Sequence, residues 1–277
     1  MYVFSYFCIV NRKICFISLL MLLICFVIAV MWYYSSIPYY KPAIEQTGLT
    51  VKSYTDDSIR IAYIGDSWAD RHRFMPHVID SILCENTRLS VKVKAAGVGG
   101  LVSKEIYYSI FNNDEVKNII EWGPSYCIIS AGINDTNKKM GATYYGENMR
   151  LIISLLLRYD ITPVVIEIPY YDIQSSFNRM DVMTKLRAVR SMIWTGSLID
   201  CIDNYVRSYD EMLTKNNWQD KVVTIRRNQW NPDGYNDSRL IYVDDKMHLN
   251  VKGYFVLDSC IAMNLKFTFD NRDVIAR

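Results

Sequence analysis

The residues from Ile14 to Tyr34 constrain the fold of this chain more than any others. They read ICFISLLMLLICFVIAVMWYY, in which Ser18 is the one plainly polar side chain. A helix needs about 20 predominantly apolar residues to cross a bilayer. A buried core helix of this length would normally show a polar face. The sequence therefore predicts a transmembrane anchor over residues 14–34.

The basic residues around this run predict its orientation. Arg12 and Lys13 precede it directly, whereas the first basic residue after it is Lys41. The positive-inside rule then places residues 1–13 in the cytoplasm and the bulk of the chain outside it, on the periplasmic or extracellular side. A cleaved secretory signal is the alternative, but its apolar region usually spans about 7–15 residues. A lipoprotein site at Cys25 is less favoured, because the apolar run continues past that cysteine.

The rest of the chain has the composition of a globular protein. Lys and Arg total 31 against 29 Asp and Glu, and no long run carries one sign of charge, which argues against a nucleic-acid partner. Residues 35–57 contain two prolines and no sustained periodicity, so we expect a linker there. Residues 58–277 contain no internal repeat, and we expect them to form one domain.

Short β-rich runs alternate with longer amphipathic stretches through this domain. The strand candidates are IRIAYIG, LSVKVKAAG, YCIISAG, TPVVIEIP and KVVTIR. Such alternation is typical of βαβ units. It predicts an α/β fold in which a parallel sheet of about five strands is covered by helices on both faces, as in three-layer, flavodoxin-like proteins.

The cysteines and histidines give no sign of a metal centre. The three histidines, His72, His77 and His248, have no ligand spacing with cysteines or with one another. No cysteine pair has CxxC spacing. Four cysteines outside the cytoplasm could form two disulfides, but the segments around Cys127 and Cys260 suit buried thiols, so the sequence favours no particular bridge. The cysteines of the exported part are Cys84, Cys127, Cys201 and Cys260. We expect neither a metal nor a cofactor.

Polar residues follow four of the predicted elements at the sheet edge where ligands bind in such folds. Ser67 follows the first strand in IGDSW, and the second strand ends in AAGVGG. Asn134 follows the third strand in GIND, and DDKMH near the C-terminus holds Asp245 and His248. Each piece alone fits an ordinary turn or capping pair. A dinucleotide-binding loop is disfavoured, because AAGVGG lacks GxGxxG spacing.

Taken together and in order, these blocks resemble those of the SGNH (GDSL-like) hydrolase superfamily. The resemblance spans residues 59–263. The matching blocks are Gly65-Asp66-Ser67, Gly97, Gly132-Ile133-Asn134-Asp135 and Asp245-Lys246-Met247-His248. Two positions depart from the family pattern. Trp68 replaces the usual leucine after the serine, and Ala95 stands where an asparagine often precedes the glycine.

The resemblance implies a role for each matched residue. Ser67 is expected to be the nucleophile, His248 its general base and then acid, and Asp245 the residue that orients the imidazole. The Ser67 N–H, the Gly97 N–H and the Asn134 amide would form the oxyanion hole. Asp244 is a less favoured orienting residue than Asp245. We expect Asp66 to brace the loop, and His72 and His77 to be structural or surface residues.

The resemblance implies a serine esterase, and an outward-facing anchored member suggests removal of O-acetyl groups from an envelope or exported polysaccharide. The loop NQWNPDGYNDSR at 228–239 offers aromatic and amide groups of the kind that line sugar sites. An O-acyltransferase would use the same residues with a sugar hydroxyl as acceptor. Lipid or thioester hydrolysis is a third possibility, and a non-catalytic, membrane-tethered glycan-binding or assembly protein represents a different class.

Overall fold

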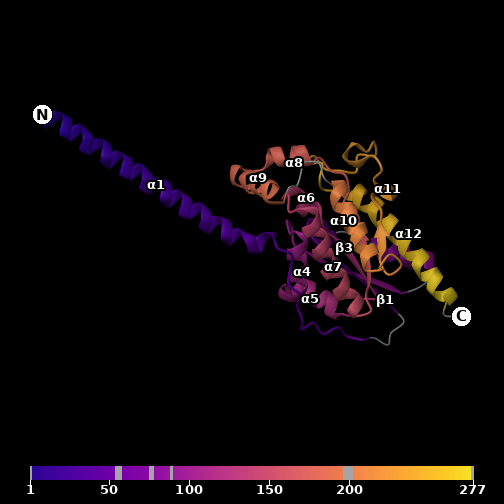
Figure 1. Ribbon diagram of the computed structural model, residues 1–277. Coiled ribbons are helices and arrows are strands. Elements are labelled where there is room, and N and C mark those ends of the chain that lie inside the picture. The colour runs from indigo at the N-terminus through magenta and orange to yellow at the C-terminus, as the bar shows by residue number, and fades with distance from the viewer. Residues whose placement is uncertain (1, 54–57, 75–77, 88–89, 196–201, 276–277) are drawn as a thin grey trace. The chain divides into compact units, whose positions relative to one another are not determined.

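The computed structural model describes residues 2–53, 58–74, 78–87, 90–195 and 202–275, which divide into two compact units. The first unit, Met1–Lys41, consists of helix α1 (Tyr2–Tyr40) (Figure 1). Its segment Ile14–Tyr34 has a mean hydropathy of 3.2 and is not buried, so it is long and apolar enough to span a membrane. Such a helix is compatible with a signal anchor or with a signal peptide.

The second unit, Pro42–Arg277, is built on a five-stranded sheet whose strands are all parallel, in the order β2-β1-β3-β4-β5. The strands are β1 (Ile59–Gly65), β2 (Val91–Gly97), β3 (Tyr126–Ser130), β4 (Thr162–Ile166) and β5 (Val223–Ile225). Each lies within one of the five strand candidates. The predicted α/β fold with a parallel sheet is confirmed.

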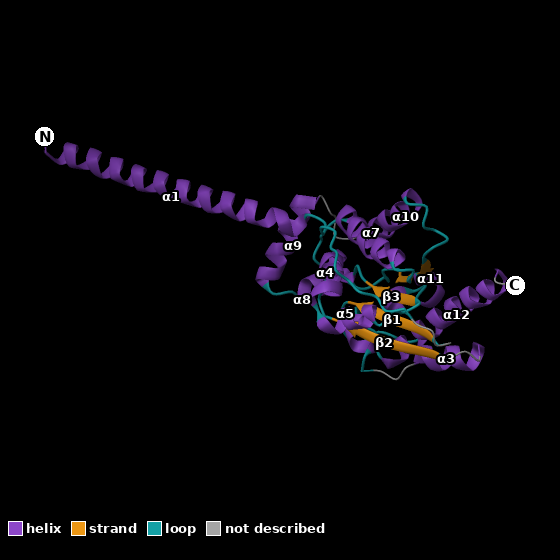
Figure 2. Ribbon diagram, turned by 90° about the horizontal axis from the view of Figure 1, so that it is seen from below, coloured by secondary structure: helices purple, strands orange, loops and turns teal. Residues whose placement is uncertain are grey.

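Helices cover both faces of this sheet (Figure 2). On one face α3 packs against α12, and on the other α4 contacts α5 and α7, while α7 contacts α10. The helices are α2 (Ser67–His72), α3 (Val78–Thr87), α4 (Ser103–Asn112), α5 (Asp114–Glu121), α6 (Ile133–Asn137), α7 (Ala142–Arg158), α8 (Ile173–Arg179), α9 (Val182–Thr195), α10 (Ile202–Lys215), α11 (Arg227–Trp230) and α12 (Val251–Ile275), with a 3₁₀ turn at Gly234–Asn236.

The position of each strand explains its sequence. All five residues of β3 are buried, and β3 lies in the middle of the sheet, where both faces are covered by helices. The edge strand β2 instead alternates, with Val91 and Val93 buried and Lys92 and Lys94 exposed. The continuous apolar run and the alternating run therefore belong to the same sheet.

The segment expected as a linker is partly built into the second unit. Residues 42–53 lie along the helices of one face, where the Ala43 N–H donates to Asn148 on α7 at 2.8 Å and the Gln46 N–H donates to the Tyr107 hydroxyl on α4 at 2.7 Å. The Tyr159 hydroxyl donates to the Leu49 carbonyl at 2.8 Å. The structure thus divides the chain at residue 41, whereas the sequence placed the boundary at residue 57. Residues 54–57 lie outside the described part.

Candidate active site

Ser67 is the first residue of α2, directly after β1. Gly65, the last residue of β1, lies so close to β3 that a Cβ at this position would be 2.1 Å from the Ser130 carbonyl oxygen. The strand can therefore end in this way only because residue 65 has no side chain. Asp66 is the N-cap of α2, and its carboxylate accepts from the Trp68 N–H at 3.0 Å. The strand end and the cap together place the Ser67 side chain at the carboxyl edge of the sheet.

Ser67, His248 and Asp245 form a continuous hydrogen-bonded chain. The Ser67 Oγ lies 2.9 Å from His248 Nε2, and His248 Nδ1 lies 2.5 Å from Asp245 Oδ2. The serine and the histidine are 181 positions apart in sequence. The fold therefore brings together all three residues to which the sequence assigned proton chemistry, in the order nucleophile, imidazole and carboxylate.

A tight turn presents the histidine to the serine. The second oxygen of Asp245 accepts from the Met247 N–H at 2.9 Å and from the His248 N–H at 2.8 Å. Burial raises the pKa of Asp245, but the hydrogen bonds from the His248 ring and from these two N–H groups outweigh it, so the pKa lies below its usual value. Asp245, and not its neighbour Asp244, thus holds the imidazole as an ionised acceptor.

Two glycines of the second block lie close to the serine helix. A Cβ added to Gly97 would lie 2.5 Å from the Asp70 nitrogen and 2.7 Å from the Asp66 oxygen, and one added to Gly99 would lie 3.8 Å from the Ser67 Cβ. A side chain at residue 97 would therefore collide with the backbone of α2. The glycine block allows two backbone segments to meet next to Ser67.

Asn134 lies on α6, after Gly132, which has a φ of +108°. Its Nδ2 donates to Asp66 Oδ2 at 3.4 Å, so the amide is placed beside the N-cap of the serine helix. Burial raises the pKa of Asp66 to about 6, although hydrogen bonds from the Trp68 N–H and the Ser130 hydroxyl oppose the shift. Asp66 braces the loop, as its sequence position suggested.

Several supporting residues lie outside the sequence blocks. The Ser130 hydroxyl donates to Asp66 at 3.2 Å. Asp135 is fully buried and accepts from both the N–H and the hydroxyl of Ser103, at 2.8 and 2.6 Å. This contact joins α6 to the start of α4, just beyond the glycine loop. Burial raises the pKa of Asp135 to about 7, against the effect of the two hydrogen bonds from Ser103.

A second Asp–His pair lies behind the site. His72, at the end of α2, places its Nε2 2.9 Å from Asp258 Oδ2 on α12, and both side chains are 1% exposed. The sequence offered structural and surface roles for His72, and the structure gives it a buried structural one. The sequence gives no indication of this role beyond the position of His72, five residues after Ser67. His77 lies outside the described residues.

The two departures from the family pattern are accommodated by packing. Trp68 is buried, with its ring edge-on to Trp230 at 5.9 Å and to Tyr254 at 6.3 Å. Trp230 comes from the 228–239 loop, so this part of the predicted sugar cleft is core. Ala95 pairs with Tyr63 in the sheet.

A pocket of about 440 Å³ opens beyond the carboxyl ends of β4 and β5, at the same edge of the sheet as Ser67. The 228–239 loop contributes three residues to it, and the Arg227 guanidinium lies over the Tyr170 ring at 3.7 Å. The lining residues are Glu167, Tyr170, Arg226, Arg227, Asn228, Asn231 and Pro232. The pocket therefore combines an aromatic ring with amide and charged groups.

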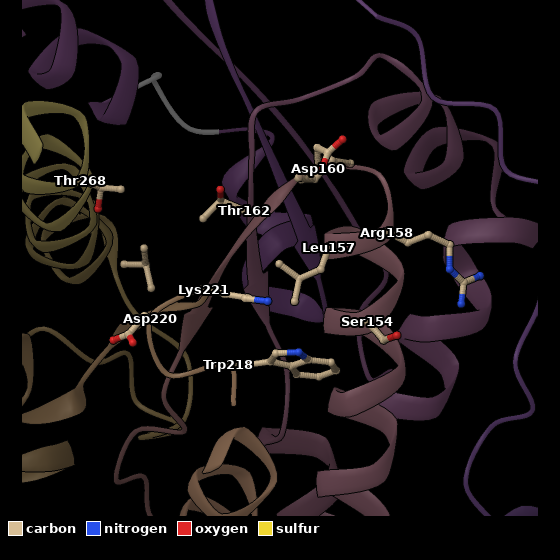
Figure 3. Close-up of a pocket in the computed structure, with 11 residues that line it drawn as sticks. Ser154, Leu157, Arg158, Asp160, Thr162, Trp218, Asp220, Lys221 and Thr268 are labelled. Carbon is tan, nitrogen blue, oxygen red and sulfur yellow. The ribbon is translucent and has the colours of Figure 1, made fainter. Parts of the chain in front are cut away.

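A larger pocket, of about 860 Å³, lies at the opposite end of the strands, where β4 and β5 begin (Figure 3). Its walls include Thr162, the first residue of β4, and Val223, the first residue of β5. Because a five-residue strand is about 16 Å long, this pocket is separated from the site by the length of β4. None of the predicted site residues lines it.

The described residues contain no group of three or more His, Cys, Asp or Glu side chains placed to hold a metal ion. Five cysteines whose side chains the structure describes are free thiols, namely Cys15, Cys25, Cys84, Cys127 and Cys260. Cys201 lies outside the described part, so no structural statement applies to its pairing.

Comparison with known proteins identifies the fold. No family model and no curated protein matches the chain. Among solved structures, a lipase/acylhydrolase from Enterococcus faecalis is similar, with 18% identity, a TM-score of 0.53 and coverage of 76% of this chain and 96% of that one. An acetyl xylan esterase from Geobacillus stearothermophilus has 15% identity, a TM-score of 0.51 and coverage of 78% and 95%.

Proposed function

Because the chain has the SGNH (GDSL-like) hydrolase fold, we propose that it is a membrane-anchored serine esterase that removes O-acetyl groups from an envelope or exported polysaccharide. The observation that carries the proposal is the hydrogen-bonded chain from Ser67 through His248 to Asp245. A serine, an imidazole and a carboxylate in this order are the components of nucleophilic acyl transfer.

The geometry supports a two-step reaction. His248 Nε2 accepts the Ser67 hydroxyl proton as the oxygen attacks the ester carbonyl, and then returns that proton to the leaving sugar hydroxyl. Asp245 stabilises the imidazolium that forms between these events. In the second step His248 removes a proton from water as the water oxygen attacks the acetyl carbonyl. The bond to Ser67 Oγ then breaks, Ser67 takes the proton from His248, and acetic acid leaves and ionises to acetate and a solvent proton. Each step is balanced without a cofactor.

We assign the oxyanion hole to the Ser67 N–H, the Gly97 N–H and the Asn134 amide. The contact between Gly97 and the backbone of α2 supports this assignment, as does the position of Asn134 beside Asp66. Such donors stabilise negative charge on the carbonyl oxygen as it develops, and each contributes about 3–4 kcal/mol to the transition state.

Two observations support a polysaccharide substrate. The pocket beside Tyr170 and Arg227 combines a ring with amide groups, as sugar sites do. The similar Geobacillus protein is named for acetyl xylan. The apolar helix Ile14–Tyr34 supports anchoring, with residues 1–13 in the cytoplasm and the catalytic unit outside.

The test is acetate release by the full chain in detergent, from a chromogenic acetyl ester and from an acetylated polysaccharide. We expect both substrates to be cleaved, and Ser67→Ala to abolish both activities without changing the far-ultraviolet circular dichroism. Release from the chromogenic ester alone would support the esterase activity and exclude the tested polysaccharide as the substrate. Acetyl transfer to an added glycan without acetate release would replace hydrolysis by acyl transfer.

A further inference from the structure

Helix α9 (Val182–Thr195) exposes an apolar face. Val182, Leu186, Val189 and Ile193 follow one another at spacings of three or four residues, so they share one side of the helix. Their exposed fractions are 71%, 58%, 42% and 81%, and the adjacent Met183 is 60% exposed. A surface helix normally turns such a stripe toward the core. Here the stripe faces away from the protein.

The opposite side of α9 is the side that packs. Ala188 and Ser191, which lie there, are both 2% exposed. Small and polar residues thus face the protein, while the large aliphatic residues face outward. The exposure is therefore a property of how α9 is seated. Figures 1 and 2 both show α8 and α9 at the periphery of the second unit.

Basic side chains accompany the apolar stripe. Lys185, Arg187 and Arg190 lie on α9, and Arg179 ends α8, whereas Asp181 is the one acidic residue between positions 179 and 195. An apolar stripe flanked by lysine and arginine is the pattern of helices that lie in the interface of an anionic bilayer. A sugar would account for the charge but not for the stripe.

The proposed membrane anchor lies only a few residues before the second unit in sequence. The apolar segment ends at Tyr34 and the second unit begins at Pro42. Residues 35–41 reach at most about 25 Å even when fully extended. If the segment is anchored as proposed above, Pro42 stays within about 25 Å of the bilayer, so a face of the second unit can reach the bilayer surface.

We propose that α9 docks into the interface of the bilayer that holds the anchor, with its aliphatic stripe among the acyl chains and its basic residues at anionic headgroups. This inference rests on the proposed anchoring but not on the esterase activity. It also bears on access to the site. The Arg179 guanidinium donates to the Asp245 carbonyl, and the Asp172 N–H, just before α8, donates to the Lys246 carbonyl at 3.2 Å. Docking would therefore hold the Asp245–His248 turn near the membrane surface.

The test is amide hydrogen exchange on the full chain in nanodiscs that contain one copy each. Discs of phosphatidylcholine with phosphatidylglycerol are compared with discs of phosphatidylcholine alone. We expect amides 182–195 to exchange about tenfold more slowly in the anionic discs. The double variant Leu186→Ser, Ile193→Ser should abolish the difference. Both side chains are exposed, so neither change should affect folding.

The matched control replaces two other exposed aliphatic residues, Ile44→Ser and Met263→Ser, which are 74% and 56% exposed. This variant should exchange like the wild type. Equal exchange in all discs would overturn the proposal. Protection that appears only with several copies per disc would also overturn it, since a second copy would then cover α9. Failure of the chain to co-purify with discs would remove the anchor and the inference with it, while acetate release in detergent tests the esterase independently.

Discussion

The described residues contain two Asp–His pairs in very different surroundings, one joined through His248 Nδ1 at 2.5 Å and the other through His72 Nε2 at 2.9 Å. Asp245 and His248 lie on a turn, with exposed fractions of 33% and 17%, and the second nitrogen of the imidazole faces Ser67. His72 and Asp258 lie between α2 and α12 and are 1% exposed. The first pair has a third partner with a reactive hydroxyl, whereas the second is enclosed by aromatic rings, with Tyr63 at 4.7 Å and Tyr254 at 6.4 Å from the His72 ring.

The carboxylates of the two pairs differ in the direction of their pKa shifts. Hydrogen bonds from the His248 ring and two backbone N–H groups overcome partial burial and lower the pKa of Asp245. Burial dominates at Asp258 and raises its pKa, although the hydrogen bond from His72 opposes this. Asp258 Oδ1 and His72 Nδ1 have no hydrogen-bond partner among the described residues. Proton transfer needs a ready acceptor and access to substrate, and only the pair on the turn has both.

The largest expected effect separates the pairs by activity. His248→Ala should lower kcat for acetyl ester cleavage by at least about 10⁴-fold, because the base that activates Ser67 is lost. The free energy of unfolding should change much less, by about 1–2 kcal/mol, since the side chain lies on a turn and is only partly buried. Steady-state kinetics and urea denaturation of the full chain in detergent measure the two quantities. Activity within tenfold of the wild type would exclude His248 as the base.

The sequence predicted the chemical pair and not the buried one for a physical reason. Ser67 and Asn134 each follow a strand at the carboxyl ends of a parallel sheet, where ligands bind in such folds, and the Asp245–His248 turn was predicted because the spacing of its two residues resembles that of the SGNH family. The partnership of His72 with Asp258 depends instead on how α2 packs against α12, 186 positions later. No local pattern carries such a contact. The sheet itself could be predicted because its strands are continuous apolar or alternating runs bounded by turns.

The segment from residue 42 to residue 53 shows the same limit. Pro42, its scattered charges and its lack of periodicity indicated a linker, and it does lack regular secondary structure. Its place in the second unit comes from the hydroxyl of Tyr107 and the amide of Asn148, which accept hydrogen bonds from its backbone. Pairing of this kind between an irregular segment and distant side chains leaves no periodic trace in the sequence.

The buried pair should matter for stability more than for rate. Asp258→Ala should lower the free energy of unfolding by about 3–5 kcal/mol, because His72 would be left without its partner in the core. The kcat of the folded fraction should change by less than about tenfold. Asp258→Asn keeps an oxygen acceptor for His72 and should cost less. If Asp258→Ala lost activity at wild-type stability, the pair would act on Ser67 and the distinction between the two pairs would fail.

Asn134 and Asp135 sharpen the comparison, because they are adjacent on α6 and face different surroundings. Asn134 donates to Asp66 beside the serine, and Asn134→Ala should lower kcat by about 10²–10³-fold with little change in KM, since one oxyanion donor is removed. Asn134→Asp, which replaces a donor by an acceptor of the same size, should be at least as impaired. An effect on KM alone would remove Asn134 from the oxyanion hole.

Asp135 is the buried counterpart, and its effect should be smaller and dependent on pH. Its pKa is raised from 3.8 to about 7 in the folded chain, chiefly by burial. Between about pH 4 and pH 7 the folded state therefore holds a proton that the unfolded state has released, and stability falls as the pH rises through this range. Asp135→Asn cannot ionise and still accepts from the Ser103 N–H. We expect the variant to match the wild type near pH 4 and to exceed it by about 1–3 kcal/mol at pH 8.

Urea denaturation of the full chain in detergent at several pH values measures this difference. Part of the slope should remain in Asp135→Asn, because the pKa of Asp66 is also raised, to about 6. Ser103→Ala is the matched control: it removes one hydrogen bond that favours the ionised carboxylate, so it should steepen the loss of stability with pH. A pH dependence unchanged by either substitution would show that Asp135 is ionised in the folded chain despite its burial, and that enclosure alone does not separate the structural carboxylates from the catalytic one.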